Sequence, residues 1–263
     1  MMKMAKAKVF NMQSFSTSDG PGIRTVVFFQ GCNLRCDWCH NPESQAVDEI
    51  PEIFIAEKCI ACEVCEGECY AGARSKTVRE FTVDELWNLL ATDLPYIKNS
   101  TGGITFSGGE CMLQVEFLEE IVKICRKNGV HTAVDTAGHV PFEWLQRVNP
   151  DMFLYDIKAS NPQKHLDLTG VDGVLIWENL RKLTQKNYDI QLRIPCIPEA
   201  NWDEMQDIAN RLKEIGVKNI ELLAYHRLGE GKATWLGKEA KIFNTPSEEE
   251  MNLLWKLFGY QKK

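Results

Sequence analysis

The chain has 263 residues, of which 44% are hydrophobic, and a formal net charge of −7. This composition excludes a generally disordered chain, and the acidic balance argues against nucleic acid as the main partner. No run approaches the ~18 consecutive apolar residues of a membrane span. Residues 1–20 lack the apolar segment of a secretory signal, so we expect a cytoplasmic protein with no membrane partner.

Apolar runs of strand length alternate with amphipathic segments of helix length. The predicted strands are 23–31, 104–107, 131–135, 152–158, 190–194 and 219–225. The predicted helices start at a capping box at 82–85 and continue with 113–127, 174–187, 203–216 and a C-terminal segment from 245. Strands separated by helices indicate βαβ units and a parallel sheet, and six units are too few for a closed eight-stranded barrel. We therefore predict an α/β fold, an open partial (β/α)6 barrel spanning residues 1–263.

Seven of the ten cysteines fall into two clusters. Without a secretory signal the thiols stay reduced, and clustered reduced thiols usually hold metal. Cys32, Cys36 and Cys39 follow the first predicted strand, separated by three and two residues. Three thiolates can hold a [4Fe–4S] cluster with one iron open to a substrate or cofactor. The alternative is a structural zinc knuckle with His40 or a distant cysteine as its fourth ligand.

The cysteine loop resembles that of the radical S-adenosylmethionine superfamily through its CxxxCxWC pattern at 32–39. The preceding DGPGIR at 19–24 is similar to the activating enzymes of glycyl radical enzymes, of the pyruvate formate-lyase activase type. The resemblance implies an oxidoreductase that reductively cleaves S-adenosylmethionine at a [4Fe–4S] cluster. The radical so formed would abstract hydrogen from a backbone glycine of a partner glycyl radical enzyme. It also implies a flavodoxin or ferredoxin as electron donor.

The resemblance extends to the ends of the later predicted strands. Gly108, Gly109 and Glu110 match the loop that binds the methionine amino group of the cofactor, where a carboxylate suits an ammonium. Asp135 and Thr136 match a site for a monovalent cation near the cofactor carboxylate. The remaining residues with implied roles are Asp156 near the target glycine, Lys158 pairing the cofactor carboxylate, and the cofactor contacts Trp38, His40, Arg193 and His226.

The second group of cysteines lies in an acidic segment, predicted as a ferredoxin-like insert at 41–80. Cys59, Cys62, Cys65 and Cys69 have the spacing of a bacterial ferredoxin run, and the resemblance implies one auxiliary [4Fe–4S] cluster. The fourth cysteine of such a run can ligate a different cluster, so Cys111 is a rival ligand. Cys69 is favoured because it lies in the same short segment.

Two other functions stay open from the sequence. One is a radical S-adenosylmethionine enzyme acting on a small molecule, which the DGPGIR motif disfavours. The other is a non-enzymatic iron–sulfur or zinc protein, which the iron, sulfide and zinc content would distinguish. The sequence does not identify which glycyl radical enzyme would be activated.

Overall fold

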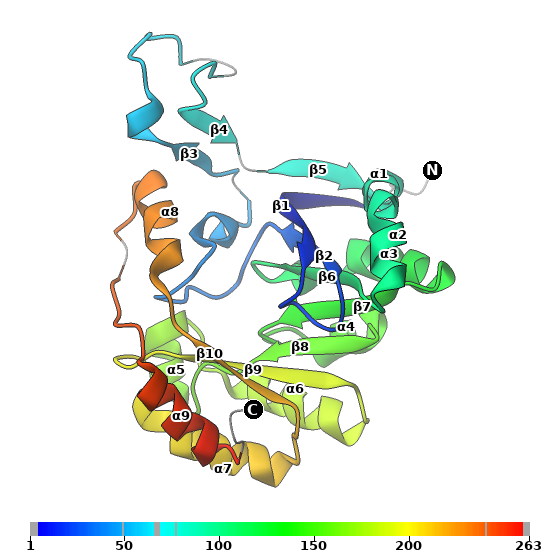
Figure 1. Ribbon diagram of the computed structural model, residues 1–263, viewed down its shortest axis with the longest axis vertical. Helices are drawn as coiled ribbons and strands as arrows, with labels where there is room; N and C mark the ends of the chain where they lie inside the picture. The colour runs from blue at the N-terminus through cyan, green and yellow to red at the C-terminus, as the bar shows by residue number, and fades with distance from the viewer. Residues whose placement is uncertain (1–4, 49, 66–68, 77, 240, 260–263) are drawn as a thin grey trace.

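The computed structural model describes residues 5–48, 50–65, 69–76, 78–239 and 241–259. Within these residues eight strands form one curved sheet in the order β10-β9-β8-β7-β6-β2-β1-β5 (Figure 1). The strands that pair in parallel are β2 (Arg24–Phe29), β6 (Gly103–Gly108), β7 (His131–Thr136), β8 (Met152–Asp156), β9 (Ile190–Cys196) and β10 (Ile220–Ala224). These six correspond to the six predicted strands, and the open barrel is confirmed.

Two antiparallel strands that the sequence pattern did not reveal extend this sheet. β1 (Lys6–Ser16) pairs with β2, and β5 (Arg79–Thr82) pairs with β1. Much of β1 is exposed and its sequence mixes polar and apolar residues, so it lacks the apolar run by which a buried strand is recognised. Because β5 belongs to the main sheet, the predicted insert range 41–80 overlaps that sheet by two residues, Arg79 and Glu80.

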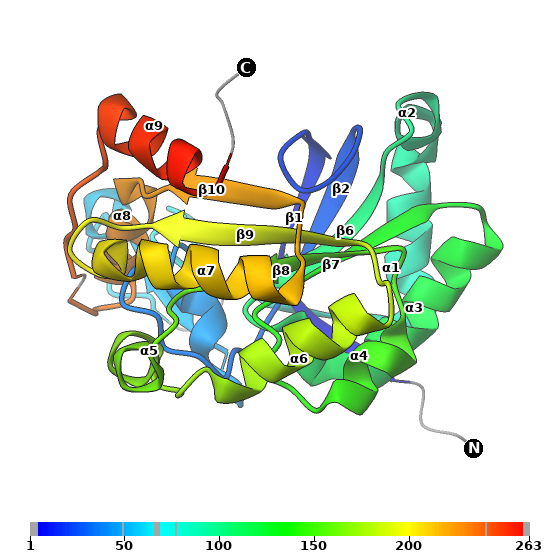
Figure 2. The same cartoon turned by 90° about the horizontal axis from the view of Figure 1, so that it is seen from below.

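Helices cover the outer, convex side of the curved sheet, where Figures 1 and 2 show α3, α4, α6 and α7. The helices are α1 (Val83–Leu90), α2 (Leu94–Asn99), α3 (Val115–Lys127), α4 (Phe142–Val148), α5 (Pro162–Thr169), α6 (Val174–Gln185), α7 (Met205–Ile215), α8 (Glu230–Trp235) and α9 (Glu248–Leu257). α3 illustrates why these segments form helices, because Phe117, Ile121 and Cys125 recur at helical spacing and are buried on one face. The capping boxes at Thr82 and Ser247 start α1 and α9.

The insert forms a separate hairpin that projects beyond the barrel (Figure 1). Its strands β3 (Glu52–Phe54) and β4 (Arg74–Lys76) form a two-stranded antiparallel sheet of their own. The loop between them carries Cys59, Cys62 and Cys65, all exposed. These thiols therefore lie outside the hydrophobic core of the barrel.

Arg24 anchors the DGPGIR segment inside the barrel. Its side chain is fully buried and donates to Thr105 Oγ1 (2.6 Å), Ile104 O (2.8 Å) and Pro21 O (3.1 Å). The Thr105 hydroxyl in turn donates to Asp19 O at 2.7 Å. A buried guanidinium needs such acceptors, because leaving its donors unpaired is costly. The segment before β2 is thereby folded inward, and Asp19 reaches the barrel interior.

Candidate functional site

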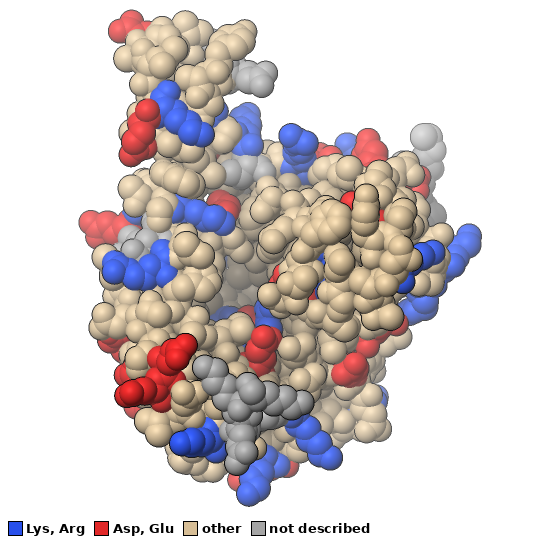
Figure 3. All heavy atoms as spheres, viewed as in Figure 1, with Lys and Arg blue, Asp and Glu red and all other residues tan. Residues whose placement is uncertain are grey.

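The carboxyl ends of the parallel strands surround a cavity of about 500 Å³, here called the inner cavity. On the face drawn in Figure 3 the molecule is hollowed between the strands and the C-terminal segment. A cavity of this size suits a small-molecule cofactor. Its lining includes most of the predicted site residues of the barrel: Cys32, Cys36, Trp38, Cys39, His40, Gly108, Gly109, Asp135, Thr136, Asp156, Lys158, Arg193 and His226.

The cysteine loop leaves β2 through Gly31, whose φ of +100° favours glycine. Backbone bonds then tie the loop to α5: Arg35 N donates to Thr169 O at 2.6 Å, and Asp37 N to Leu168 O at 3.1 Å. Gly109 lets the loop after β6 approach closely, since a Cβ there would lie 2.3 Å from the carbonyl oxygen of Gly31. The three thiols are therefore presented on a fixed loop beside the glycine pair.

Arg193 connects the carboxylates of two strand ends with that of Asp19 in the segment before β2. Its guanidinium pairs with Asp135 and lies 3.2 Å from Asp156 Oδ1 and 3.9 Å from Asp19 Oδ1. Lys158 Nζ lies 2.9 Å from Asp156 Oδ2. Burial opposes ionisation of Asp156, but Lys158 and Arg193 outweigh it and lower the pKa of that carboxyl. Two cations and three carboxylates thus share one wall of the inner cavity.

Glu110 is buried behind this wall and is not among the residues that line the inner cavity. Its carboxylate accepts hydrogen bonds from Thr136 Oγ1 (2.8 Å), Ala137 N (3.0 Å) and Met112 N (3.2 Å). In this structure Glu110 therefore braces the turn after β7. The predicted contact with an ammonium remains a prediction. Burial raises the pKa of Glu110 to about 7.

This raised pKa predicts a pH dependence of stability. Between the ordinary pKa of 4.5 and about 7, the unfolded protein loses the Glu110 proton while the folded protein keeps it. Stability therefore falls as pH rises across this window, by about 3 kcal/mol in total for this group. Thermal unfolding of the reconstituted protein without S-adenosylmethionine should show a lower midpoint at pH 8 than at pH 5.5, and Glu110→Gln should reduce the difference. An equal drop in Glu110→Gln would contradict the assignment.

Aromatic rings close one end of the inner cavity. The His40 ring stacks on His226, with centroids 4.2 Å apart and an interplanar angle of 20°. The Tyr225 ring also stacks on His40, with centroids 5.9 Å apart. The Trp38 ring meets the Phe243 ring edge-on. Such flat surfaces suit a purine ring. The sequence interpretation missed the contributions of Tyr225 and Phe243. Tyr225 is the last residue of a predicted strand, which is where site residues were expected. Nothing in the sequence marked Phe243.

Comparison with known proteins decides the family. A family model described as the Radical SAM superfamily matches residues 26–212. The trans-4-hydroxy-L-proline dehydratase activating enzyme of Clostridioides difficile is 34% identical, with 95% of each chain covered. This chain belongs to the radical SAM superfamily. The pyruvate formate-lyase 2-activating enzyme of Escherichia coli (strain K12) is also 34% identical, with 92% of this chain and 85% of that one covered.

Structural comparison agrees with this radical SAM assignment. A solved domain of the pyruvate-formate lyase-activating enzyme from Bacteroides vulgatus ATCC 8482 matches with a TM-score of 0.52 and 29% identity, covering 61% of this chain and 96% of that one. The chain is thus a radical SAM enzyme of the group that activates glycyl radical enzymes, and the family implies a [4Fe–4S] cluster and S-adenosylmethionine. Among the described residues, no helix has the length and apolar character to cross a membrane.

The residues of this radical SAM loop fit a cluster. Cys32, Cys36 and Cys39 all line the inner cavity, and burial raises the pKa of Cys32 and of Cys36 to about 12. Three half-buried thiolates on one short loop would repel one another, so they would require a positive group between them. An iron–sulfur cluster with three thiolate ligands would supply it.

Cys111, the rival ligand for an auxiliary cluster, belongs to the barrel and not to the insert. It is fully buried in the core, and its thiol contacts Phe106 O and Asp135 O, both at 3.4 Å. Cys69 lies at the far end of the insert loop, where its carbonyl accepts from Gly72 N at 2.9 Å. Of the two rival ligands, Cys69 shares the projecting hairpin with the other insert cysteines, and Cys111 belongs to the barrel.

Proposed function

We propose that this radical SAM activating enzyme performs its reaction in the inner cavity, with Cys32, Cys36 and Cys39 holding the [4Fe–4S] cluster. The observation that carries this is the convergence of three thiols, two cations and an aromatic surface on one cavity. When bound, the cluster would supply the electron for cleavage of the C–S bond of S-adenosylmethionine, and the radical so formed would take hydrogen from a glycine of the partner. The partner is a glycyl radical enzyme, such as the dehydratases and lyases named for the relatives.

The chain's own residues orient the reactants. Lys158 and Arg193 offer cations to the methionine carboxylate, and the Gly108–Gly109 backbone allows close approach of the amino group. His40 and His226, with Trp38 nearby, offer the surface for the adenine ring. These rings would also shield the radical from water and so from side reactions.

We also propose a monovalent cation at Asp135 and Thr136. The Asp135 carboxylate is buried beside a second carboxylate, Asp156, and Arg193 is shared between them. Burial raises the pKa of Asp135 against the pull of Arg193. An additional cation would compensate the negative charge that Arg193 leaves unpaired when it turns to the cofactor.

Asp156 and Lys158 allow a paired test of their roles. Asp156→Asn keeps the size of the side chain and should lower the yield of glycyl radical about tenfold or more, with little change in S-adenosylmethionine affinity. Lys158→Ala should instead weaken cofactor binding about 10- to 100-fold, because it removes a charged donor. Equilibrium binding and electron paramagnetic resonance on both variants distinguish the roles. The reverse pattern would refute the assignment.

For the insert we propose one auxiliary [4Fe–4S] cluster held by Cys59, Cys62, Cys65 and Cys69. The ferredoxin spacing and the shared hairpin support this. The anaerobically reconstituted protein should contain about eight irons per chain. Cys69→Ala should alter the spectrum of the auxiliary cluster, and Cys111→Ala, the matched control, should leave it unchanged. A changed spectrum in Cys111→Ala alone would overturn the choice of ligand.

The electron donor we propose is a reduced flavodoxin or ferredoxin. The cluster would need one electron per cleavage, and proteins of these two classes deliver single electrons at low potential. Their acidity would match the cationic groups beside the cysteine loop described below.

A further inference from the structure

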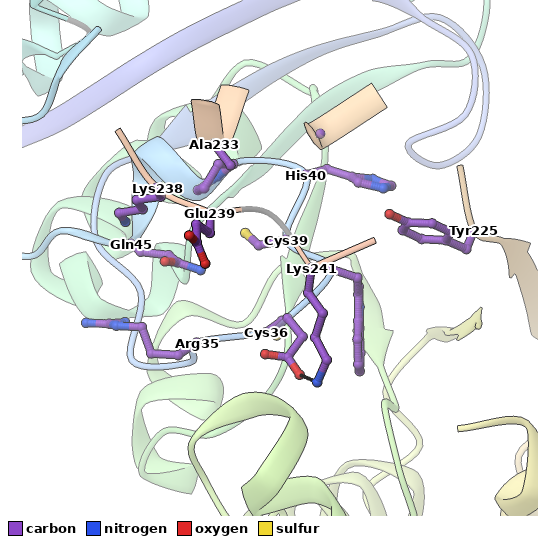
Figure 4. A pocket seen from close by; sticks show the side chains of 14 residues that line it. Arg35, Cys36, Cys39, His40, Gln45, Tyr225, Ala233, Lys238, Glu239 and Lys241 are labelled. Carbon is purple, nitrogen blue, oxygen red and sulfur yellow. Dashed lines mark hydrogen bonds and ion pairs between the residues drawn. The ribbon is translucent and has the colours of Figure 1, made fainter. Parts of the chain in front are cut away.

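A second cavity lies between the cysteine loop and the C-terminal segment. This outer cavity, of about 180 Å³, is shown in Figure 4. Its lining consists of residues 35–40, Pro42 and Gln45 on one side and, facing them, Tyr225, Gly229, Ala233, Lys238, Glu239 and Lys241. Cys36 and Cys39 line both the outer and the inner cavity. The loop is therefore a thin partition, and a cluster held by its sulfurs could be approached from outside the barrel.

The wall that faces the loop is firmly attached. Lys232 Nζ donates to Asn41 Oδ1 (2.7 Å) and pairs with Glu43 Oε1 (2.9 Å). Gly229 touches the loop so closely that a Cβ there would lie 2.9 Å from His40 Cα. Phe243 packs edge-on against Trp38 within the core. These contacts fix the outer cavity as a built feature of the fold.

The rim of the outer cavity carries more positive than negative charge. Arg35, Lys238 and Lys241 are exposed there, and the Arg35 guanidinium is held in place by two carbonyls of the cysteine loop. Of the two carboxylates on the rim, Asp37 is paired with Lys241 Nζ at 2.8 Å, and Glu239 points toward the cavity (Figure 4). This local excess of cations contrasts with the net charge of −7 of the whole chain.

We propose that an acidic one-electron carrier protein docks over the outer cavity and reduces the cluster from the Cys36–Cys39 side of the loop. The inference rests on the proposed function and adds the place where the electron enters. In this step the carrier loses one electron and the cluster gains it, with no bond made or broken. The inner cavity stays open to the cofactor and the glycine of the partner, so the carrier and the partner enzyme approach different faces of the loop.

Substitutions at two neighbouring residues should change the affinity for the carrier in opposite directions. Lys238→Gln removes a cation from the rim, and Glu239→Gln removes a carboxylate one residue away. Binding of oxidised flavodoxin and of oxidised bacterial ferredoxin to the anaerobically reconstituted holoenzyme is measured by calorimetry at low and high salt. For at least one carrier, Lys238→Gln should weaken binding about two- to fivefold at low salt, and Glu239→Gln should strengthen it by a similar factor. Lys213→Gln, on the exposed face of α7, is the remote control and should change nothing.

The outcomes separate this proposal from the proposed function. Equal affinities in all variants, changes of the same sign at 238 and 239, or no binding of either carrier to the wild type would overturn the docking site. Cluster reduction by photoreduced 5-deazariboflavin, a small uncharged reductant, should be unaffected in both variants. Absence of S-adenosylmethionine cleavage in wild type with this reductant would instead refute the proposed function, whatever the binding data show.

Discussion

Replacing Cys32, Cys36 and Cys39 together with Ala should abolish S-adenosylmethionine cleavage and reduce the iron content from about eight to about four per chain. The three thiols line the inner cavity as the proposed cluster ligands, and without them the cofactor would have no open iron to bind. The proposed auxiliary cluster on the projecting hairpin should remain, because its cysteines lie outside the barrel core. Iron analysis and the release of 5′-deoxyadenosine from anaerobic samples measure both effects.

A matched control distinguishes ligand loss from thiol loss. Cys125→Ala also removes a thiol, but this side chain is fully buried on α3 and does not line the inner cavity. It should keep both clusters and the cleavage activity. If the triple variant still cleaved S-adenosylmethionine, the assignment of the catalytic cluster would be wrong.

Arg193→Met should destabilise the protein by about 3–5 kcal/mol at pH 8. The substitution leaves the buried Asp135 and Asp156 without their shared counterion, with only Lys158 remaining beside Asp156. The deficit should shrink as the pH falls, because the unpaired carboxylates then take up protons and no longer carry a buried charge. Thermal unfolding of wild type and variant at pH 5.5 and pH 8 measures the difference.

Arg147→Met is the control for this experiment. Arg147 also pairs with two acids, Glu116 and Glu119, but its side chain is 43% exposed. Its loss should therefore cost clearly less, because solvent screens exposed ion pairs. If Arg193→Met were no more destabilising than Arg147→Met, the buried network would not carry the energy assigned to it.

The parallel strands β2, β6, β7 and β8 were predictable because they are buried along most of their length and read as nearly continuous apolar runs. Strand β1 was not, since its half-exposed pattern carries no such run. The hairpin of the insert was likewise hidden, because β3 and β4 have three residues each and are mostly exposed. The starts of α1 and α9 were recognisable from local chemistry alone, because each has a capping box, at Thr82 and at Ser247.

The residues of the site were predictable where a motif places them at a strand end. Their partners were not, because these come from distant parts of the chain. Lys232 Nζ donates to Glu43 Oε1, next to the cysteine loop, although the two residues are 189 positions apart in the sequence. The Arg24 guanidinium donates to Thr105 Oγ1, which is 81 positions away in the sequence. Glu110 was recognised as a motif residue, but only the fold shows that its carboxylate contacts Thr136 and Ala137. Side-chain direction depends on packing that no local pattern records.

This radical SAM enzyme should place a radical on a glycine of a partner protein. The most direct measurement is anaerobic incubation of the reconstituted protein with S-adenosylmethionine, photoreduced 5-deazariboflavin and each glycyl radical enzyme of the source genome, followed by electron paramagnetic resonance. We expect a glycyl doublet on one partner, and cleavage of that partner at a single glycine on exposure to oxygen. Release of 5′-deoxyadenosine with no doublet on any of these partners would contradict it and favour a small-molecule substrate.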